Sequence, residues 1–349
     1  MYGIPYRHPS IKNKRLQDPH VVILGAGASI AACKIDKNGK TVPALSNIHK
    51  VLGLTDMLNG YGFSAEELED FELLFSNING KGEWAELQDN LESAVRNYFK
   101  SLELPDEPTI YDYLILSLTE KDAIVTFNWD PFLMQAYRRN LTVGNLPQLI
   151  FPHGNVGVGL CYDCKVKGYA DCLCPNCFKE LSDMKLLFPV HRKNYYDGEI
   201  IQNEWAEAKR VLSRAAGVTV FGYSAPETDF EAYNLLKDSY KKSNITTIAP
   251  FSIINLKEAE EEQRSKWSDI YDKHMVTFHE TFYESLLWSA PRVSLESLFD
   301  AILQQQPRAN VKSFRNFATL EELQGFVKTI TESRGQAVLG RQLGATTPW

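Results

Sequence analysis

The sequence lacks the features that would place it in a specialised class of protein. It has no apolar run of about 18 residues and no N-terminal segment in which basic residues precede an apolar stretch, which argues against a membrane span and a secretory signal. Basic residues are not in excess, and the net charge of −7 gives no global field that would attract DNA or RNA. No internal repeat or low-complexity block interrupts the chain. We therefore expect a cytoplasmic protein that binds neither membranes nor nucleic acids directly.

The remaining composition is that of an ordinary globular protein. Apolar residues make up 44% of the chain and charged residues 23%, as is usual for soluble domains. The 349 residues suffice for one large domain or two smaller ones. Residues 1–20 are polar and basic, and we expect them to form an arm that precedes the first strand.

Cysteine is scarce outside one short segment: five of the six cysteines lie between Cys161 and Cys177. Clustering of this kind, with no signal peptide, indicates metal binding rather than disulfides. Two Cys-x-x-Cys pairs, Cys161 with Cys164 and Cys174 with Cys177, would give four thiolate ligands to one tetrahedral Zn²⁺. A site closed by four sulfurs is structural, because no position is left for water. A redox-active pair is the alternative, and Cys172 could replace Cys174 as a ligand.

Short apolar segments alternate with segments of helical periodicity along the chain. Strands are predicted at 21–24, 122–127, 147–151, 217–221, 251–256 and 275–278. Helices are predicted at 43–58, 64–76, 83–102, 203–215, 280–288, 294–304 and 320–331, the first three within a helical insertion over 43–118. This alternation predicts an α/β fold with a doubly wound parallel sheet, whose ligands bind at the carboxyl ends of the strands.

The segment 21–30 reads as a buried strand, a turn with Gly25 and Gly27, and the start of a helix. The free amides at such a helix start favour a phosphate group, so the turn predicts a site for a nucleotide pyrophosphate. A plain strand-to-helix turn is the alternative. Ile30 replaces the third glycine of the dinucleotide fingerprint, and no acidic residue stands out about 20 residues further on.

Polar residues that follow the other predicted strands are further candidates for a site. They are Asn128, Asp130, His153, Ser224 and Asn255. Each has an ordinary structural explanation, because asparagine is common where a strand turns and most histidines are packed or surface residues. Asp229 similarly fits the N-cap of a helix. Their common placement after strands is what favours a shared site.

Five short motifs together resemble those of the sirtuin family. In chain order they are Gly25-Ala26-Gly27-Ala28-Ser29, Thr126-Phe127-Asn128-Trp129-Asp130, His153-Gly154 followed by the paired cysteines, Gly222-Tyr223-Ser224, and Ile254-Asn255. The resemblance implies a large Rossmann-type NAD-binding domain at 21–290 that carries a small zinc-ribbon and helical module, with the ribbon at 160–180. It implies that NAD lies in the cleft between these parts. Residues 291–349 would form C-terminal helices and a tail.

The resemblance also assigns roles to individual residues. It assigns to NAD binding Gly25, Ala26, Gly27, Ser29, Asp130, Gly222, Ser224 and Asn255, and to catalysis Asn128 and His153. Among these, the turn at 25–29 would meet the pyrophosphate, Asp130 the nicotinamide carboxamide, and Asn255 the adenosine ribose. Cys161, Cys164, Cys174 and Cys177 would hold the structural zinc.

Three departures from the deacylases of this family point to a different branch. Val42-Pro43-Ala44-Leu45 stands where they have Pro-Asp-Phe-Arg, and Phe127 stands where they have a glutamine. Leu187-Phe188-Pro189-Val190 stands where they have the Phe-Gly-Glu segment that pairs with acyl-lysine peptides. The chain more closely resembles the prokaryotic sirtuin-like NAD hydrolases of antiphage defence, which use the same pocket with water as the acceptor.

We therefore predict an NAD⁺ hydrolase that cleaves the nicotinamide–ribose bond and releases nicotinamide and ADP-ribose. Because constant NAD loss would kill the host, we expect control by a co-encoded regulatory protein or by homo-oligomerisation through the C-terminal helices. Two other functions stay open at this stage. One is an NAD-dependent protein deacylase or ADP-ribosyltransferase, and the other is a non-catalytic nucleotide sensor.

Overall fold

The computed structural model describes residues 18–335, apart from residues 59, 80, 189–197, 226–228, 242–249, 269, 271–275, 304, 306 and 309. The predicted arm at 1–20 and the tail after residue 335 therefore lie almost wholly outside the described residues. Within the ranges described, no helix has both the length and the apolar character that a membrane crossing requires.

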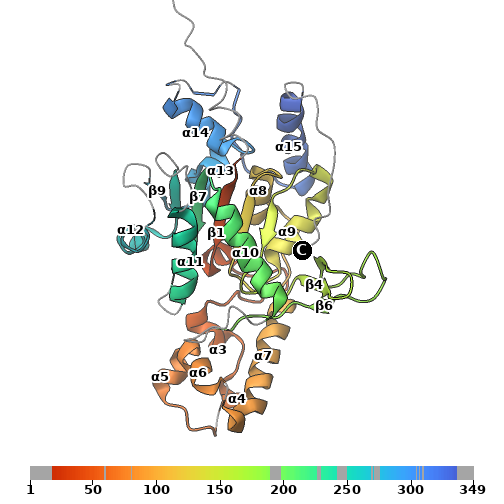
Figure 1. Cartoon of the computed structure of the whole chain (residues 1–349), viewed down its shortest axis with the longest axis vertical. Helices are drawn as coiled ribbons and strands as arrows, with labels where there is room; N and C mark the ends of the chain where they lie inside the picture. Colours follow the sequence, from red (N-terminus) through yellow and green to blue (C-terminus); the bar gives the residue numbers. More distant parts are fainter. Residues whose placement is uncertain are drawn as a thin grey trace, which may run out of the picture.

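In the described part of the chain, six parallel strands form a sheet at the centre of the molecule (Figure 1). They are β1 (His20–Leu24), β2 (Ala123–Thr126), β3 (Gln148–Ile150), β7 (Gly217–Phe221), β8 (Phe251–Ile254) and β9 (Val276–His279). Their order in the sheet is β3-β2-β1-β7-β8-β9, and every neighbouring pair is parallel. This is the Rossmann order, in which the winding reverses beside the first strand. The predicted doubly wound α/β fold is confirmed.

Helices connect the strands of the sheet and continue the chain after β9. They are α2 (Ala26–Ala32), α8 (Ile110–Ser117), α9 (Phe132–Arg139), α10 (Glu199–Ser213), α11 (Phe230–Lys241), α12 (Glu260–Trp267), α13 (Leu286–Ser289), α14 (Ser294–Leu303) and α15 (Leu320–Gly335). Figure 1 shows α10 and α11 in front of the sheet. Every residue of β1 and β7 is buried, as expected for parallel strands covered on both faces.

Two smaller units project from this sheet (Figure 1). One is a helical module made of α3 (Ile48–Val51), α4 (Thr55–Leu58), α5 (Ala65–Glu69), α6 (Phe71–Ile78) and α7 (Ala85–Lys100). The other is an antiparallel sheet in the order β5-β4-β6, with β4 (Val158–Cys161), β5 (Val166–Tyr169) and β6 (Ser182–Asp183). Short 3₁₀ turns lie at Leu45–Asn47, Gly82–Trp84, Leu141–Val143, Lys257–Ala259 and Phe282–Glu284.

Three of the predicted helices are interrupted in the structure. The helix predicted over 64–76 is divided into α5 and α6, because Asp70 is extended between them and its side chain caps the start of α6. The helix predicted over 43–58 is split into α3 and α4, because Gly53 adopts a φ of +67° and ends α3 in a left-handed turn. The helix predicted over 280–288 is reduced to a 3₁₀ turn and α13, with Ser285 in an extended conformation between them. The Ser285 hydroxyl donates to Phe282 O at 2.6 Å, a local bond that competes with the helix.

His20, the first residue of β1, connects the sheet to the C-terminal helix α14. Its ring nitrogens lie 2.9 Å from Ser294 Oγ on α14 and 2.8 Å from Thr219 Oγ1 on β7. Burial lowers the pKa of His20 from 6.5 to about 4, against a smaller opposing effect of Asp122. The ring therefore stays neutral in the folded protein at pH values where it is charged in the unfolded chain.

We expect His20 to make the stability fall as the pH is lowered. Because its folded pKa of about 4 lies below the unfolded value of 6.5, its contribution is complete above pH 6.5 and is lost towards pH 4, by up to about 3 kcal/mol. Burial raises the pKa of Asp130 to about 6, so Asp130 makes the folded protein more stable as the pH falls over the same range. The two contributions therefore oppose each other in the pH dependence of the wild-type stability. Urea unfolding of wild type and His20→Gln at about pH 7 and about pH 4.5 isolates the His20 contribution. An identical pH dependence of the two proteins would contradict it.

Candidate functional site

The turns after β1 and β7 meet where the winding of the sheet reverses, which is where open α/β sheets bind ligands. Gly25 separates β1 from α2, as the sequence predicts, and Gly222 follows β7. The two turns are in direct backbone contact. The Gly25 amide donates to Phe221 O at 3.1 Å, and the Gly27 amide donates to Gly222 O at 2.9 Å.

This contact gives the glycines a role that needs no ligand. A Cβ on Gly25 would lie 2.5 Å from Tyr223 Cα, and a Cβ on Gly27 would lie 2.9 Å from Gly222 Cα. Gly222 itself has a φ of +60° and leaves no room for a Cβ against α2. These glycines therefore allow close contact with a second protein loop, the turn after β7. Ala26 is the exposed residue of the turn.

Ser29, Asn128 and Asp130, which the sequence assigns to one site, are joined by hydrogen bonds. Ser29 Oγ donates to Asp130 Oδ2 at 2.6 Å. Asn128 Nδ2 donates to Ser29 Oγ at 2.9 Å and to Gly25 O at 2.8 Å. Tyr111 on α8 is the fourth side chain, with its hydroxyl 2.7 Å from Ser29 Oγ and 3.3 Å from Asn128 Nδ2. This polar network links the turn after β1 to the turn after β2.

The polar network is shielded from solvent. Tyr111 and Ser29 are each 1% exposed, Asp130 is 4% exposed and Asn128 is 9% exposed. Burial raises the pKa of Asp130 from 3.8 to about 6, although its bonds from Ser29 and from the Phe132 amide lower it in part. Burial also raises the pKa of Tyr111. At neutral pH the tyrosine is therefore a neutral donor, and Asp130 carries the negative charge.

His153 follows β3 in a loop that is bonded to the loop of Asn128. The side-chain amide of Asn155 donates to Asn128 O at 3.0 Å and to Asp130 O at 2.7 Å. His153 is buried, and its Nε2 lies 3.8 Å from Asp229 Oδ1. The Asp229 carboxylate therefore lies beside the imidazole ring. The two residues that the sequence assigns to catalysis therefore lie on two loops that the structure ties together.

Aromatic rings surround His153. Phe127 meets the His153 ring edge-on with centroids 4.8 Å apart, and it stacks on Tyr223 at 4.7 Å. Trp205 of α10 lies 5.9 Å from the His153 ring and 5.8 Å from Phe127. Phe127, the departure from the glutamine of the deacylases, is therefore part of the packing that orients the histidine.

Ser224 and Asn255 lie further out along the same edge of the sheet. Ser224 is exposed, and its backbone oxygen accepts from Lys266 Nζ at 3.2 Å. Asn255 is half-buried, and its Oδ1 accepts from the Leu256 amide at 2.9 Å. Among the described residues, neither shares a hydrogen bond with the polar network. Their assignment to NAD stays a prediction.

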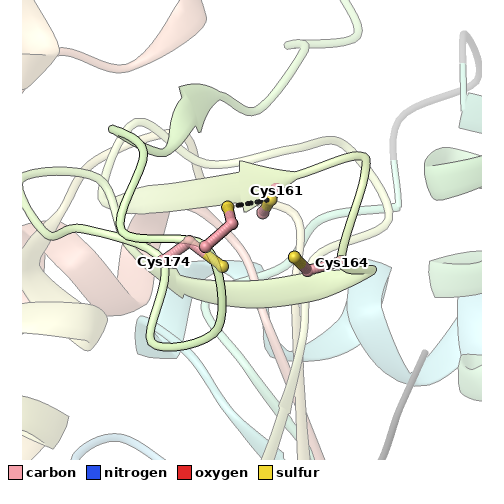
Figure 2. Close-up of side chains that lie close together, drawn as sticks. Cys161, Cys164 and Cys174 are labelled. Carbon is pink, nitrogen blue, oxygen red and sulfur yellow. Dashed lines mark hydrogen bonds between the residues drawn. The ribbon is translucent and has the colours of Figure 1, made fainter.

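The zinc-ribbon cysteines converge, as Figure 2 shows for the three that it labels. The Sγ atoms of Cys161, Cys164, Cys174 and Cys177 all lie within 4.8 Å of one another. Four thiolates at this spacing fit a tetrahedral Zn²⁺ with bonds of about 2.3 Å. Cys172 is not part of this group, and its Sγ lies 3.8 Å from Asp171 Oδ1. The open choice of ligand is therefore decided in favour of Cys174.

A cavity of about 360 Å³ lies beside the ribbon, between the end of α7, α9 and β5. Two residues that line the cavity form ion pairs. Arg138 lies 2.7 Å from Asp171, which also lines it, and Lys100 lies 2.6 Å from Asp183. None of the residues assigned to NAD lines this cavity. Ser29 and Asp130, two of those residues, instead bond to each other at the strand ends.

Three side chains of this region were not predicted to belong to the site. Asp229 fits a helix N-cap by its sequence, yet its carboxylate faces His153. Asn155 could have been suspected, because it closes the His153-Gly154 loop. Tyr111 has no local signal, since its contact with Ser29 joins residues 82 positions apart.

No protein-family profile matches the chain, and no curated protein matches it. Solved structures of Sir2 proteins do match it. A Sir2 homolog–NAD complex has 15% sequence identity and a TM-score of 0.40, and the match covers 78% of this chain and 88% of that one. A Sir2–p53 peptide–NAD⁺ complex has 17% identity and a TM-score of 0.36, covering 79% and 93%.

Proposed function

We propose that this protein is a sirtuin-like NAD⁺ hydrolase, which cleaves the bond between nicotinamide and ribose and serves as the NAD-depleting effector of an antiphage defence system. The observation that carries the proposal is the bonded arrangement of Asn128, Asp130 and the His153 loop beside the turn after β1. It lies at the reversal point of a Rossmann sheet, where such sheets hold dinucleotides. NAD is the substrate, and the zinc is structural.

The packing of Leu187 and Phe188 supports water, rather than a peptide, as the acceptor. They begin the segment that stands where the sirtuin deacylases pair with acyl-lysine peptides. Here both residues are buried, and the Phe188 ring stacks on Phe75 at 4.7 Å and packs against Trp129 at 5.0 Å. The two residues that complete the departure, Pro189 and Val190, lie outside the described residues.

The proposed reaction needs little help for its leaving group. The nicotinamide nitrogen is already cationic, so it takes the electron pair of the broken C1′–N bond and leaves without a proton. Positive charge then develops on the ribose, water forms the new C1′–O bond, and one proton of that water must be removed. The protein has to hold the ribose still and place water and a base beside it.

His153 is the base in this scheme. It takes the proton from the attacking water or from a ribose hydroxyl, and Asp229 stabilises the imidazolium that results. Asn128 orients the water or the ribose hydroxyls. Asp130 fixes the nicotinamide carboxamide, while Ser29 holds the carboxylate in place.

Product analysis tests the proposed reaction. Purified protein incubated with NAD⁺ is expected to give nicotinamide and free ADP-ribose in equal amounts on chromatography. The incubation is run alone and with any co-encoded proteins, because we propose that a partner controls the activity. Acetyl-ADP-ribose from an acetylated peptide, or labelled protein, would instead identify a deacylase or a transferase. NAD binding without consumption under all these conditions would identify a sensor.

The proposal extends to control by assembly. In Figure 1, α14 and α15 lie at the end of the molecule opposite the helical module, beyond the span of the sirtuin-like motifs. A surface in this position can bind a co-encoded protein or a second copy without covering the strand ends. We propose it as the site of regulation.

A further inference from the structure

Chemistry decides which way the Asn128 amide points. One of its terminal atoms lies 2.8 Å from Gly25 O, and a backbone oxygen only accepts hydrogen bonds. The atom that faces it must therefore be the donor Nδ2, because the reverse orientation would set two acceptors against each other in a buried place. Among the described residues, no hydrogen bond engages the other atom, Oδ1. The carbonyl oxygen of Asn128 is thus the atom left for a ligand.

Tyr111 completes this arrangement. Ser29 has a single hydroxyl proton, which it gives to the Asp130 carboxylate at 2.6 Å. Its oxygen must then accept, and it lies 2.7 Å from Tyr111 Oη and 2.9 Å from Asn128 Nδ2. Tyr111 Oη also lies 3.3 Å from Asn128 Nδ2. The tyrosine hydroxyl therefore touches both groups that determine where the asparagine lies.

We propose that Tyr111 is a positioning residue of this site: together with Gly25 and Ser29 it anchors the amide nitrogen of Asn128 and so directs Oδ1 at a ribose hydroxyl or at the attacking water. The inference rests on the proposed function, because it states how Asn128 acts in it. Tyr111 is 1% exposed, and it works through Asn128 rather than on the substrate.

The helix that carries Tyr111 is anchored through the next residue, Asp112. Asp112 is fully buried, and its Oδ1 accepts from Arg139 Nε of α9 at 2.7 Å and from Asn140 Nδ2 at 2.8 Å. These bonds hold α8 against α9. A tyrosine on such a helix has little freedom, as a positioning role requires.

The substitution Tyr111→Phe tests the proposal, because it removes one hydroxyl and keeps the ring. We expect kcat for NAD loss to fall by about 10- to 100-fold, as when a catalytic group is misplaced. The KM for NAD should change by less than about threefold, since no group that touches NAD is removed. Tyr113→Phe is the matched control on the same helix. Tyr113 is 3% exposed and its hydroxyl contacts Phe317, so kcat should stay within about twofold of wild type.

Two further measurements separate positioning from a loss of fold and from a failure of the proposed function. The two phenylalanine variants should melt at similar temperatures, because each loses one buried hydroxyl. The side-chain amide signals of Asn128 in a ¹H–¹⁵N spectrum, identified by their loss in Asn128→Ala, should shift in Tyr111→Phe and not in Tyr113→Phe. If wild type consumes no NAD⁺, either alone or with its co-encoded proteins, hydrolysis is refuted and these signals alone decide the positioning role. Unmoved Asn128 signals, or a wild-type kcat in Tyr111→Phe, would overturn the inference.

Discussion

His153→Ala is expected to lower the rate of NAD⁺ loss by about 100- to 10,000-fold, the contribution of a positioned general base. The imidazole is the group that takes a proton in the proposed reaction, and Asp229 at 3.8 Å stabilises its charged form. The fold should survive, because His153 lies in a loop after β3 and the sheet does not depend on its side chain. NAD⁺ consumption by chromatography measures the effect, and circular dichroism checks the fold.

The chain offers a matched control in His279, at the end of β9 on the far edge of the same sheet. His279→Ala removes a half-buried histidine from a strand end that the site does not use, so NAD⁺ loss should persist.

Asn128→Ala should abolish NAD⁺ loss with the fold intact, because it removes the side chain that orients the water or the ribose hydroxyls and that Gly25 O and Ser29 Oγ hold in place. Wild-type turnover in both His153→Ala and Asn128→Ala would end the catalytic assignment.

Cys161→Ser is expected to unfold the zinc ribbon. The buried apolar cluster of the ribbon consists of Cys161, Cys174 and Leu181, so two of its three members are themselves predicted metal ligands. In small domains of this kind the apparent free energy of structural zinc binding is on the order of 10 kcal/mol, which is the larger part of their stability. Zinc content by mass spectrometry and a melting curve should both fall in the variant. Strong chelators should do the same to wild type.

The matched control for this prediction is Cys172→Ser. Cys172 lies in the same ribbon but outside the group of four sulfurs, so its substitution should keep one zinc per chain and the wild-type melting curve. Because β4 begins at Val158, directly beyond the Asn155 loop, loss of the ribbon should also reduce NAD⁺ turnover. Full zinc content together with wild-type melting in Cys161→Ser would show that the cysteines hold no structural metal.

The elements predicted best from the sequence are those with strong local patterns. The strand at 217–221 has the same bounds in the structure, because five apolar or β-branched residues followed by a glycine specify a buried strand and its end. The helices at 43–58, 64–76 and 280–288 were predicted less well. Their apolar spacing is helical, but Gly53, Asp70 and Ser285 interrupt them through backbone conformations and side-chain bonds that periodicity does not register.

The candidate site divides in the same way. The residues after the strands could be named from the sequence, because parallel strands bring their carboxyl ends to one edge. The reason why glycine is required at these positions could not be predicted, because Gly25 and Gly27 are in contact with the turn of Gly222, nearly 200 positions away.

The sequence by itself determined the class of fold, the strand ends that carry polar side chains, and the pairs of cysteines. These depend on periodicity and spacing within a few residues, which the chain carries locally. Only the tertiary structure decided that Tyr111 bonds to Ser29 across 82 positions and that Asn128 bonds to Ser29 across 99. Such bonds depend on the order of strands in the sheet and the paths of the loops, and a hydrogen bond between distant segments leaves no pattern in either one.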